Sequence, residues 1–299
     1  MNHKSVDISV GLIRINSSFV CLKRNKTPYM DAIEFPGGKK KDFETNSECL
    51  IRELKEELNI DIDKFKFIST IKHSYEDTII TIHIYYVSRF TGSIESNENR
   101  DIVFFDYKST HKILPTHNRI LNTLKIPRVL KIISSESIID TNMEKINLYS
   151  HVRLRDVSYE DYKNGIQSIL IKNNYAGQLI VDYPHNINWN DTFHGIHYKS
   201  KYIKEFIPEK KSHRYIYSAS CHNHREINLS NTKLFDFILI SPVLSAYYGT
   251  TPLGWTSFSD LSHESFMPTL ALGGVCSLGN DLSESINNNG FGLAGIKLI

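Results

Sequence analysis

One stretch, residues 34 to 60, constrains the fold of this chain more than any other part of its sequence. It reads EFPGGKKKDFETNSECLIRELKEELNI. Pro36, Gly37 and Gly38 predict a turn, and the segment from Thr45 to Leu58 that follows contains no glycine or proline. Its apolar residues recur at helical spacing, at Leu50, Ile51, Leu54 and Leu58. The stretch therefore predicts a turn that leads into an amphipathic helix.

Three glutamates, Glu53, Glu56 and Glu57, share one face of this predicted helix, beside the apolar face. One interpretation is a solvated acidic face, supported by a favourable pair of Glu48 with Arg52 at i,i+4. The other is a cation site, because a hard divalent ion such as Mg²⁺ accepts oxygen ligands and keeps positions for water and phosphate. The lysines at 39 to 41 are either a solvated loop or a contact for phosphate.

Composition limits the class of protein. At 299 residues the chain is long enough for two domains, its formal net charge is +2, and 40% of its residues are hydrophobic. No apolar run approaches the roughly 18 residues of a membrane span, and the small net charge gives no broad basic face for direct nucleic-acid binding. The N-terminus lacks the layout of a secretory signal, and the four cysteines form no CxxC pair. We therefore expect a soluble, cytoplasmic protein without a membrane or nucleic-acid partner.

The spacing of the residues in this stretch matches a family pattern. Gly38 is followed after five residues by Glu44, and then after seven by Arg52-Glu53-Leu54-Lys55-Glu56-Glu57, with apolar Ile60 at the end. This resembles the Nudix hydrolase box, with Asn59 in place of the family's last glycine. Asparagine tolerates a positive φ, so we still expect the helix to end at Asn59 in the left-handed conformation.

The resemblance implies an α/β/α sandwich that hydrolyses a nucleoside diphosphate linked to another group. It implies Mg²⁺, with Mn²⁺ able to substitute, held by Glu53, Glu56, Glu57 and the carbonyl of Gly37. Glu53 would also serve as a proton acceptor. Glu44 and Arg52 would complete the catalytic site by bracing the loop against the helix.

The flanking segments are similar to the MutT branch of the family, which hydrolyses oxidised guanine nucleotides such as 8-oxo-dGTP to the monophosphate and pyrophosphate in nucleotide-pool sanitation, a form of DNA repair. SVGLIRINSSFVCLKRNKTPYMDAIEFPGGK contains the two strands before the box. Arg24, at the end of the second strand, matches a basic position that contacts the triphosphate. The resemblance also implies substrate contacts at Phe35 and Gly38.

Two later segments extend the same resemblance. In GSIESNENRDIVFFDY, Glu98 lies six residues before Phe104 and would join the metal site, with Glu95 as a competitor. In ILPTHNRIL, Asn118 would read the base, since an amide offers both a donor and an acceptor; the alternative is a helix N-cap. The arginine of the family's purine pocket is Thr78 here, which leaves the preferred base open.

After residue 126 the pattern changes to short β-rich runs that alternate with polar helical stretches. Eight strands are expected, at 128 to 134, 150 to 155, 178 to 182, 194 to 198, 214 to 219, 236 to 241, 268 to 272 and 292 to 297. They predict a (β/α)₈ barrel at 127–299 behind a Nudix domain at 1–126, both of α/β class. A ligand site is expected at the C-terminal ends of the strands. Its candidate residues are Arg155, Asp182, His197 and His222, with the backbone of Gly273 and Gly274, which could bind phosphate or simply form a tight turn.

The segments YSASCHNHREI, DFILISPVLSAYYGTTPLGW and TLALGGVCSLGNDLSESINNNGFGLAGIKLI resemble thiamine phosphate synthase and TenI-like barrels. Two departures stand out. In RLRDV, Arg155 is kept, but the family's glutamine is Arg153 and its lysine is Val157; SPVLSAYYGTTPLGW also lacks the lysine expected there. Losing cations that neutralise pyrophosphate predicts a degenerate barrel that binds an unknown small phosphorylated ligand. The alternative is a thiamine-pathway or ligand-binding barrel whose Nudix unit acts on another diphosphate.

Overall fold

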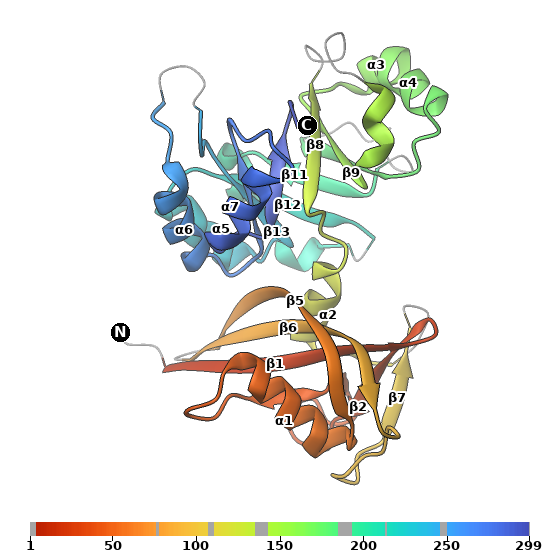
Figure 1. Ribbon diagram of the computed structural model, residues 1–299. Helices are drawn as coiled ribbons and strands as arrows, with labels where there is room; N and C mark the ends of the chain where they lie inside the picture. The colour runs from red at the N-terminus through yellow and green to blue at the C-terminus, as the bar shows by residue number, and fades with distance from the viewer. Residues whose placement is uncertain are drawn as a thin grey trace. The chain divides into compact units, whose positions relative to one another are not determined.

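The computed structural model describes residues 4–75, 78–106, 111–134, 143–184, 193–212, 214–245 and 250–298. The chain divides into two compact units, Met1–Leu124 and Lys125–Ile299 (Figure 1). Within the described residues, no helix has the length and apolar character required to cross a membrane.

The first unit is built on a mixed seven-stranded sheet. Its main path runs β3-β2-β1-β6-β5, β4 pairs with β1, and β7 pairs with β2. The strands are β1 (Lys4–Ile15), β2 (Ser18–Lys23), β3 (Ile33–Glu34), β4 (Gly37–Lys39), β5 (Asp61–Tyr75), β6 (Thr78–Thr91) and β7 (Ile102–Phe105). The long β1 lies parallel to β6, from Lys4 opposite Thr78 to Ile13 opposite Val87.

Two helices cover the two faces of this sheet. Helix α1 (Asn46–Leu58) buries Leu50, Leu54 and Leu58 in a cluster with β-strand residues on one face. Helix α2 (Pro115–Thr123) contributes Ile120 and Leu121 to a separate cluster on the other face (Figure 1). Because the side chains of a strand alternate between faces, β1 and β6 supply residues to both clusters. The predicted α/β/α sandwich is confirmed.

The ends of α1 follow from local residues. Thr45 is the N-cap and forms a capping box with Glu48, so Glu48 binds Thr45 instead of pairing with Arg52 as predicted. Asn59 is the C-cap, with φ 56° and ψ 26°, and its N–H donates to the Lys55 carbonyl. The expected left-handed end of the helix is confirmed.

The predicted turn at Pro36-Gly37-Gly38 is wrong, because Gly37–Lys39 forms β4, paired antiparallel with Ser9 and Val10 of β1. Gly37 has φ 141°, and a Cβ there would lie 2.1 Å from the Ser9 carbonyl oxygen. At Gly38 a Cβ would lie 2.4 Å from the Glu53 carboxylate. The glycines are needed for close approach of strand and helix rather than for chain reversal.

The second unit is a closed parallel barrel of order β10-β11-β12-β13-β14-β15-β8-β9. Its strands are β8 (Val129–Ser134), β9 (His151–Arg155), β10 (Gln178–Tyr183), β11 (Gly195–Tyr198), β12 (Ile216–Cys221), β13 (Phe237–Ile240), β14 (Thr269–Leu272) and β15 (Gly292–Gly295). All eight predicted strands are present with slightly different ends, and β15 closes the ring by pairing with β8. The barrel prediction is confirmed.

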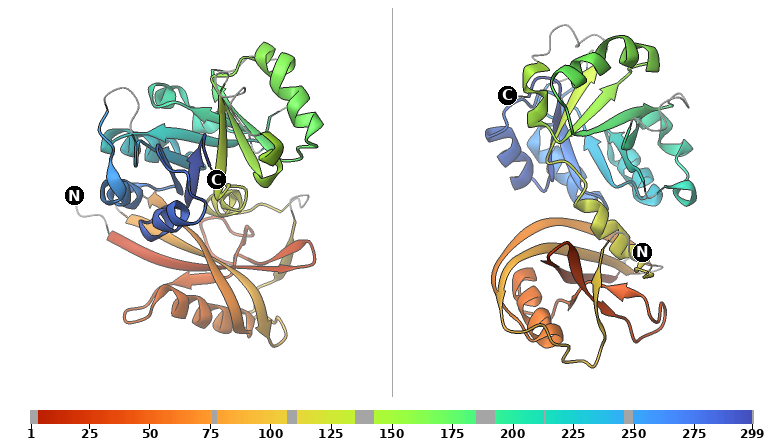
Figure 2. Two further views of the ribbon diagram at one scale, coloured as in Figure 1. Left: turned by 45° about the horizontal axis from the view of Figure 1, so that its top comes forward. Right: turned by 90° about the vertical axis from the view of Figure 1, so that its right-hand side faces the viewer.

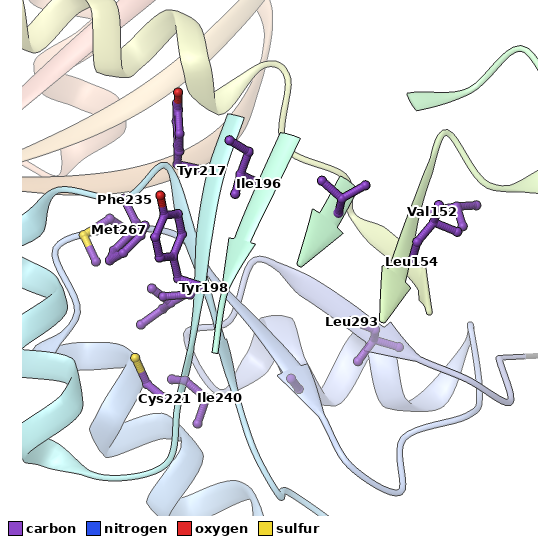
Figure 3. Packing of buried hydrophobic residues seen from close by; sticks show 14 of the residues in the cluster. Val152, Leu154, Ile196, Tyr198, Tyr217, Cys221, Phe235, Ile240, Met267 and Leu293 are labelled. Atoms are coloured by element: carbon purple, nitrogen blue, oxygen red, sulfur yellow. The ribbon is translucent and has the colours of Figure 1, made fainter. Parts of the chain in front are cut away.

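Helical segments surround the ring of strands (Figure 2). They are η1 (Met143–Leu148), α3 (Tyr159–Asp161), η2 (Tyr162–Ile166), α4 (Gln167–Lys172), η4 (Ser200–Glu205), η5 (Pro208–Lys210), α5 (His224–Lys233), α6 (Gly254–Glu264) and α7 (Asn280–Asn287). Alternate strand residues, among them Val152, Leu154, Ile196 and Cys221, pack in one cluster with helix residues (Figure 3). The residues between them, such as Leu130, Ile180 and Leu270, form a second cluster. We assign this second cluster to the barrel interior, because the side chains of a strand alternate.

Candidate active site

Arg52 gathers three of the carboxylates of the first unit. Its guanidinium donates to both oxygens of Glu44 at 2.9 and 2.7 Å, to Glu53 at 2.7 Å and to Glu56 at 2.9 Å. Arg52 also donates to the Lys39 carbonyl at 3.1 Å, and Glu44 accepts from the Lys41 N–H at 2.7 Å. These bonds from Arg52 and Lys41 lower the pKa of Glu44 to about 2. Glu44 and Arg52 thus join the loop after β4 to α1.

Arg100 gathers a second group. Its side chain is 7% exposed and donates to Glu57 Oε1 at 2.8 Å, to Glu34 Oε1 and, through Nε, to the Lys23 carbonyl at 3.2 Å. One Glu98 oxygen lies 3.7 Å from Arg100 Nη1. The guanidinium of Arg100 is therefore buried among the carboxylates of Glu34, Glu57 and Glu98.

Glu57 lies at the junction of helix and loop. Its second oxygen accepts from the Gly37 N–H at 2.8 Å. Burial raises the pKa of Glu57 to about 7, against the lowering effects of the Gly37 hydrogen bond and the Arg100 charge. The nearby Glu98 and Glu53 raise this pKa further. Glu98, and not its competitor Glu95, is therefore the loop carboxylate that acts on Glu57; the Glu95 N–H instead donates to the Leu58 carbonyl.

The predicted metal ligands are distributed between the two arginines. In the part of the chain that the structure describes, no three His, Cys, Asp or Glu side chains are grouped as a metal cluster. Their chemistry nevertheless fits a hard divalent ion, because all the donor atoms are oxygens, of four carboxylates and the Gly37 carbonyl. The two groups together place six glutamates (34, 44, 53, 56, 57 and 98) against Arg24, Arg52, Arg100 and Lys41. The six carboxyl groups outnumber the four cations, so the groups keep a surplus of negative charge even when Glu57, with its pKa raised to about 7, is protonated.

The predicted substrate residues occupy different environments. Arg24 follows β2 and donates to the second oxygen of Glu34 at 2.9 Å and to the Pro28 carbonyl at 3.0 Å. The Phe35 side chain is 2% exposed and stacks on His117 with ring centroids 5.4 Å apart. The Phe35 ring therefore belongs to the core, and a substrate contact by this residue stays a prediction. Gly38 pairs with Ser9 beneath the Glu53 carboxylate.

Asn118 lies inside α2, where its N–H donates to the Leu114 carbonyl. Leu114 is the N-cap, so the alternative role of Asn118 as a cap is wrong. The Asn118 side chain is half-buried and has no hydrogen-bond partner among the described residues. Its neighbour His117 is buried, which lowers the His117 pKa to about 4 and keeps that ring neutral. Thr78 begins β6, opposite Lys4 and Tyr75.

Sequence reasoning missed Arg100 and Glu34 as members of the site. Glu34 stands beside Phe35 in the opening stretch, but it falls outside the spacing of the box. Arg100 lies in a polar loop, and it reaches Glu34 because the Lys23 N–H pairs with the Asp101 carbonyl. That long-range pairing leaves no local signal in the sequence.

In the barrel, the predicted residues fall into two groups. Asp182 binds Arg153 at 2.7 and 3.1 Å, and Lys199 Nζ lies 3.7 Å from it. Lys199 also pairs with Asp156, whose carboxylate is 3.8 Å from Arg155. Arg153 and Lys199 were not predicted as site residues, although Arg153 stands in the segment RLRDV. These five charged residues make a cluster at the C-terminal ends of β9 to β11.

His197, another predicted residue of the barrel site, lies beside this charged cluster. His197 is fully buried between the hydroxyls of Ser218 and Ser220, each at 2.8 Å. Burial, with the charges of Arg153 and Lys199, holds the His197 pKa well below its ordinary value.

His222 and the two glycines lie at later strand ends. His222 is exposed and donates through Nδ1 to the Ser241 carbonyl at 2.7 Å. Gly273 and Gly274 follow β14 with φ of 96° and 76°, which favours glycine. Residues 246–249 of SPVLSAYYGTTPLGW lie outside the described residues.

The fold and the glutamate-rich site of the first unit define a hydrolase of phosphorus-containing anhydrides, and comparison with known proteins agrees. A NUDIX domain matches residues 6–124. An 8-oxo-dGTP diphosphatase of Proteus vulgaris is 32% identical over 96 residues, 31% of this chain and 86% of the relative. One from Buchnera aphidicola is 32% identical over 115 residues, 36% and 87% of the two chains. A CTP pyrophosphohydrolase of Escherichia coli is 31% identical over 71 residues, 24% and 53% of the two chains.

The chain belongs to the Nudix family and is a Nudix hydrolase. Nudix hydrolases generally need a divalent metal such as Mg²⁺.

Proposed function

We propose that the first unit is a Mg²⁺-dependent nucleoside triphosphate pyrophosphohydrolase of MutT type, with Mn²⁺ able to replace Mg²⁺. Water and an 8-oxo-dGTP-like nucleotide would give the monophosphate and pyrophosphate. The observation that carries the proposal is the surplus of carboxyl groups over cations in the Arg52 and Arg100 groups, next to the close-packed Gly37 and Gly38. The relatives from Proteus vulgaris and Buchnera aphidicola, both 8-oxo-dGTP diphosphatases, support the choice of substrate.

The residues proposed to hold the metal are Glu53, Glu56, Glu57 and Glu98, with the Gly37 carbonyl. A bound divalent cation would neutralise charge on the phosphates and favour ionisation of the attacking water. Glu53, packed against Gly38, would take the proton of that water as the P–O bond to the new oxygen forms and the anhydride P–O bond breaks. Arg24 would contribute a positive charge to the phosphates once it leaves Glu34.

Asn118 is proposed to read the base. Its amide is half-buried and has no partner in the described part of the chain, so its donor and acceptor are available for a purine edge. The neutral His117 and the buried Phe35 ring hold this part of α2 against the sheet.

A second substrate class, pyrimidine nucleotides, is favoured by one observation. Thr78 stands where the purine pocket of the MutT branch has an arginine, and the similar Escherichia coli protein is a CTP pyrophosphohydrolase. CTP and dCTP are therefore the competing substrates.

For the barrel, we propose that it does not synthesise thiamine phosphate and instead binds a small phosphorylated ligand. The charged cluster supports this: Arg153, Arg155 and Lys199 outnumber Asp156 and Asp182. The surplus positive charge suits an anion. In the alternative, the barrel defines the function within a thiamine pathway and the Nudix unit acts on another diphosphate. The cysteines, all free, agree with a cytoplasmic location.

The test is turnover of a nucleotide panel by the full chain with Mg²⁺. The panel contains 8-oxo-dGTP, dGTP, dCTP, CTP and a thiamine diphosphate, and both monophosphate and pyrophosphate are quantified. The proposal requires the highest kcat/KM on 8-oxo-dGTP. A preference for CTP or dCTP would support the pyrimidine alternative, and release of orthophosphate instead of pyrophosphate would reject the proposed reaction.

A further inference from the structure

Arg100 is a buried cation to which the proposed hydrolysis assigns no role. Its side chain is 7% exposed and lies among Glu34, Glu57 and Glu98. Its Nε donates to the Lys23 carbonyl at 3.2 Å, which fixes the base of the guanidinium against the end of β2. Only its two terminal nitrogens can change partner without moving the backbone.

Those two terminal nitrogens bind different carboxylates. Nη1 donates to Glu57 at 2.8 Å and lies 3.7 Å from Glu98, which are both proposed metal ligands. Nη2 donates to Glu34, which is not a proposed ligand. Arg100 therefore already holds a second acceptor beside the pair that a metal would use.

Glu34 connects Arg100 to the proposed phosphate contact. One oxygen of Glu34 accepts from Arg100, and the other accepts from Arg24 at 2.9 Å. With side chains 17% and 27% exposed, Glu34 and Arg24 are only partly screened by water. If Glu34 binds Arg100 more strongly, its bond to Arg24 becomes weaker.

We propose that Arg100 is a positioning residue that competes with a divalent cation for Glu57 and Glu98, and that Glu34 is the acceptor that lets it release them. This inference rests on the proposed assignment of Glu57 and Glu98 as metal ligands. A divalent charge beside a guanidinium repels it strongly in a partly buried site. Arg100 then relies on Glu34, and Arg24 is freed for phosphate, so metal binding prepares the substrate contact.

The test measures Mn²⁺ binding to the full chain at pH 8 by the electron paramagnetic resonance signal of free Mn²⁺, without nucleotide. Arg100→Gln should tighten binding roughly tenfold, because a competing charge is gone. Glu34→Gln should weaken binding severalfold, because the second acceptor of Arg100 loses its negative charge. The double variant should bind like Arg100→Gln alone, since Glu34 acts only through Arg100. Arg100→Lys should return the affinity toward that of the unaltered chain.

Arg89→Gln is the matched control, because Arg89 is 72% exposed on β6 and should leave Mn²⁺ affinity unchanged. If Arg100→Gln fails to fold by circular dichroism, Glu34→Gln decides, and unchanged affinity in that variant overturns the inference. Weaker binding in Arg100→Gln, or additive effects in the double variant, also overturn it. Glu57→Gln distinguishes a failure of this inference from a failure of the proposed metal site. If this variant binds Mn²⁺ as tightly as the unaltered chain, the proposed metal site itself is wrong.

Discussion

The two units use the same kind of ion pairing with opposite balances of charge. In the Nudix unit, Arg100 is shared among Glu34, Glu57 and Glu98, and carboxylates are in excess. In the barrel, Asp182 is shared between Arg153 and Lys199, and cations are in excess. A buried pair that balances its own charges serves structure, whereas a surplus of one sign calls for a ligand of the other. We therefore expect the first site to bind a cation and the second an anion.

The largest expected effect tests the negative surplus. Glu53→Gln should lower kcat by about 10³-fold or more, because one charge and one proton acceptor vanish together. The measurement is turnover at saturating nucleotide and Mg²⁺, with circular dichroism to establish that the fold persists. Asp182→Asn, in the barrel, should leave turnover per folded molecule unchanged. Full activity in Glu53→Gln would refute its assignment to the catalytic site.

The barrel variant should instead lose stability. Asp182→Asn leaves the Arg153 guanidinium, 4% exposed, without its bidentate carboxylate, so the unfolding free energy should fall by about 3 kcal/mol. Urea denaturation of the full chain, with the unfolding of each unit followed separately, measures it. The control is Asp63→Asn, which breaks the exposed pair with Arg89 and should cost less than about 0.5 kcal/mol. If Asp182→Asn costs as little as Asp63→Asn, water already screens the charged cluster of the barrel.

Acid should weaken the barrel unit through buried histidines such as His151 and His197, whereas in the first unit the buried His117 and Glu57 respond to acid in opposite directions. Burial lowers the pKa of His117 and of His151 to about 4, from an ordinary 6.5. Between these values the unfolded chain binds protons that the folded chain does not, so the contribution of each histidine to stability falls as pH drops from about 6.5 to 4 and then levels off. Glu57 acts in the opposite sense, because its raised pKa makes the folded chain bind a proton more readily than the unfolded chain. The slope approaches about 1.4 kcal/mol per pH unit for each group. Denaturation at pH 7 and pH 5 checks this, and His117→Phe should shift the stability difference between the two pH values in favour of pH 5 in the first unit only.

The smallest expected effect concerns the choice of base. Asn118→Ala should lower kcat/KM for 8-oxo-dGTP by about 1 to 3 kcal/mol in transition-state stabilisation, and less for dGTP, because a directional contact is lost. The two substrates are compared in one competition assay. Asn122→Ala, one turn further along α2, is the matched control. Equal losses on 8-oxo-dGTP and dGTP would show that Asn118 does not discriminate between them.

Much of the fold could be predicted because its signals are local. The capping residue Thr45, the apolar spacing up to Leu58 and the tolerance of Asn59 for a positive φ define α1 within one stretch of chain. Each barrel strand is likewise a short β-rich run between polar segments, so all eight were found. Spacing along one helix also placed Glu53, Glu56 and Glu57 on one face.

Sequence by itself thus determined α1, the eight strands of the barrel and the acidic face, because these depend on residues close together in the chain. Only the tertiary structure decided which cations meet those carboxylates. Arg100 reaches Glu34 and Glu57 from 66 and 43 positions away, and Arg153 meets Asp182 across 29. It also decided that Gly37 and Gly38 form a strand, since Ser9 and Glu53 come within contact of their Cα atoms. Ion pairs and close backbone contacts depend on strand register, and register is set by packing of the whole unit.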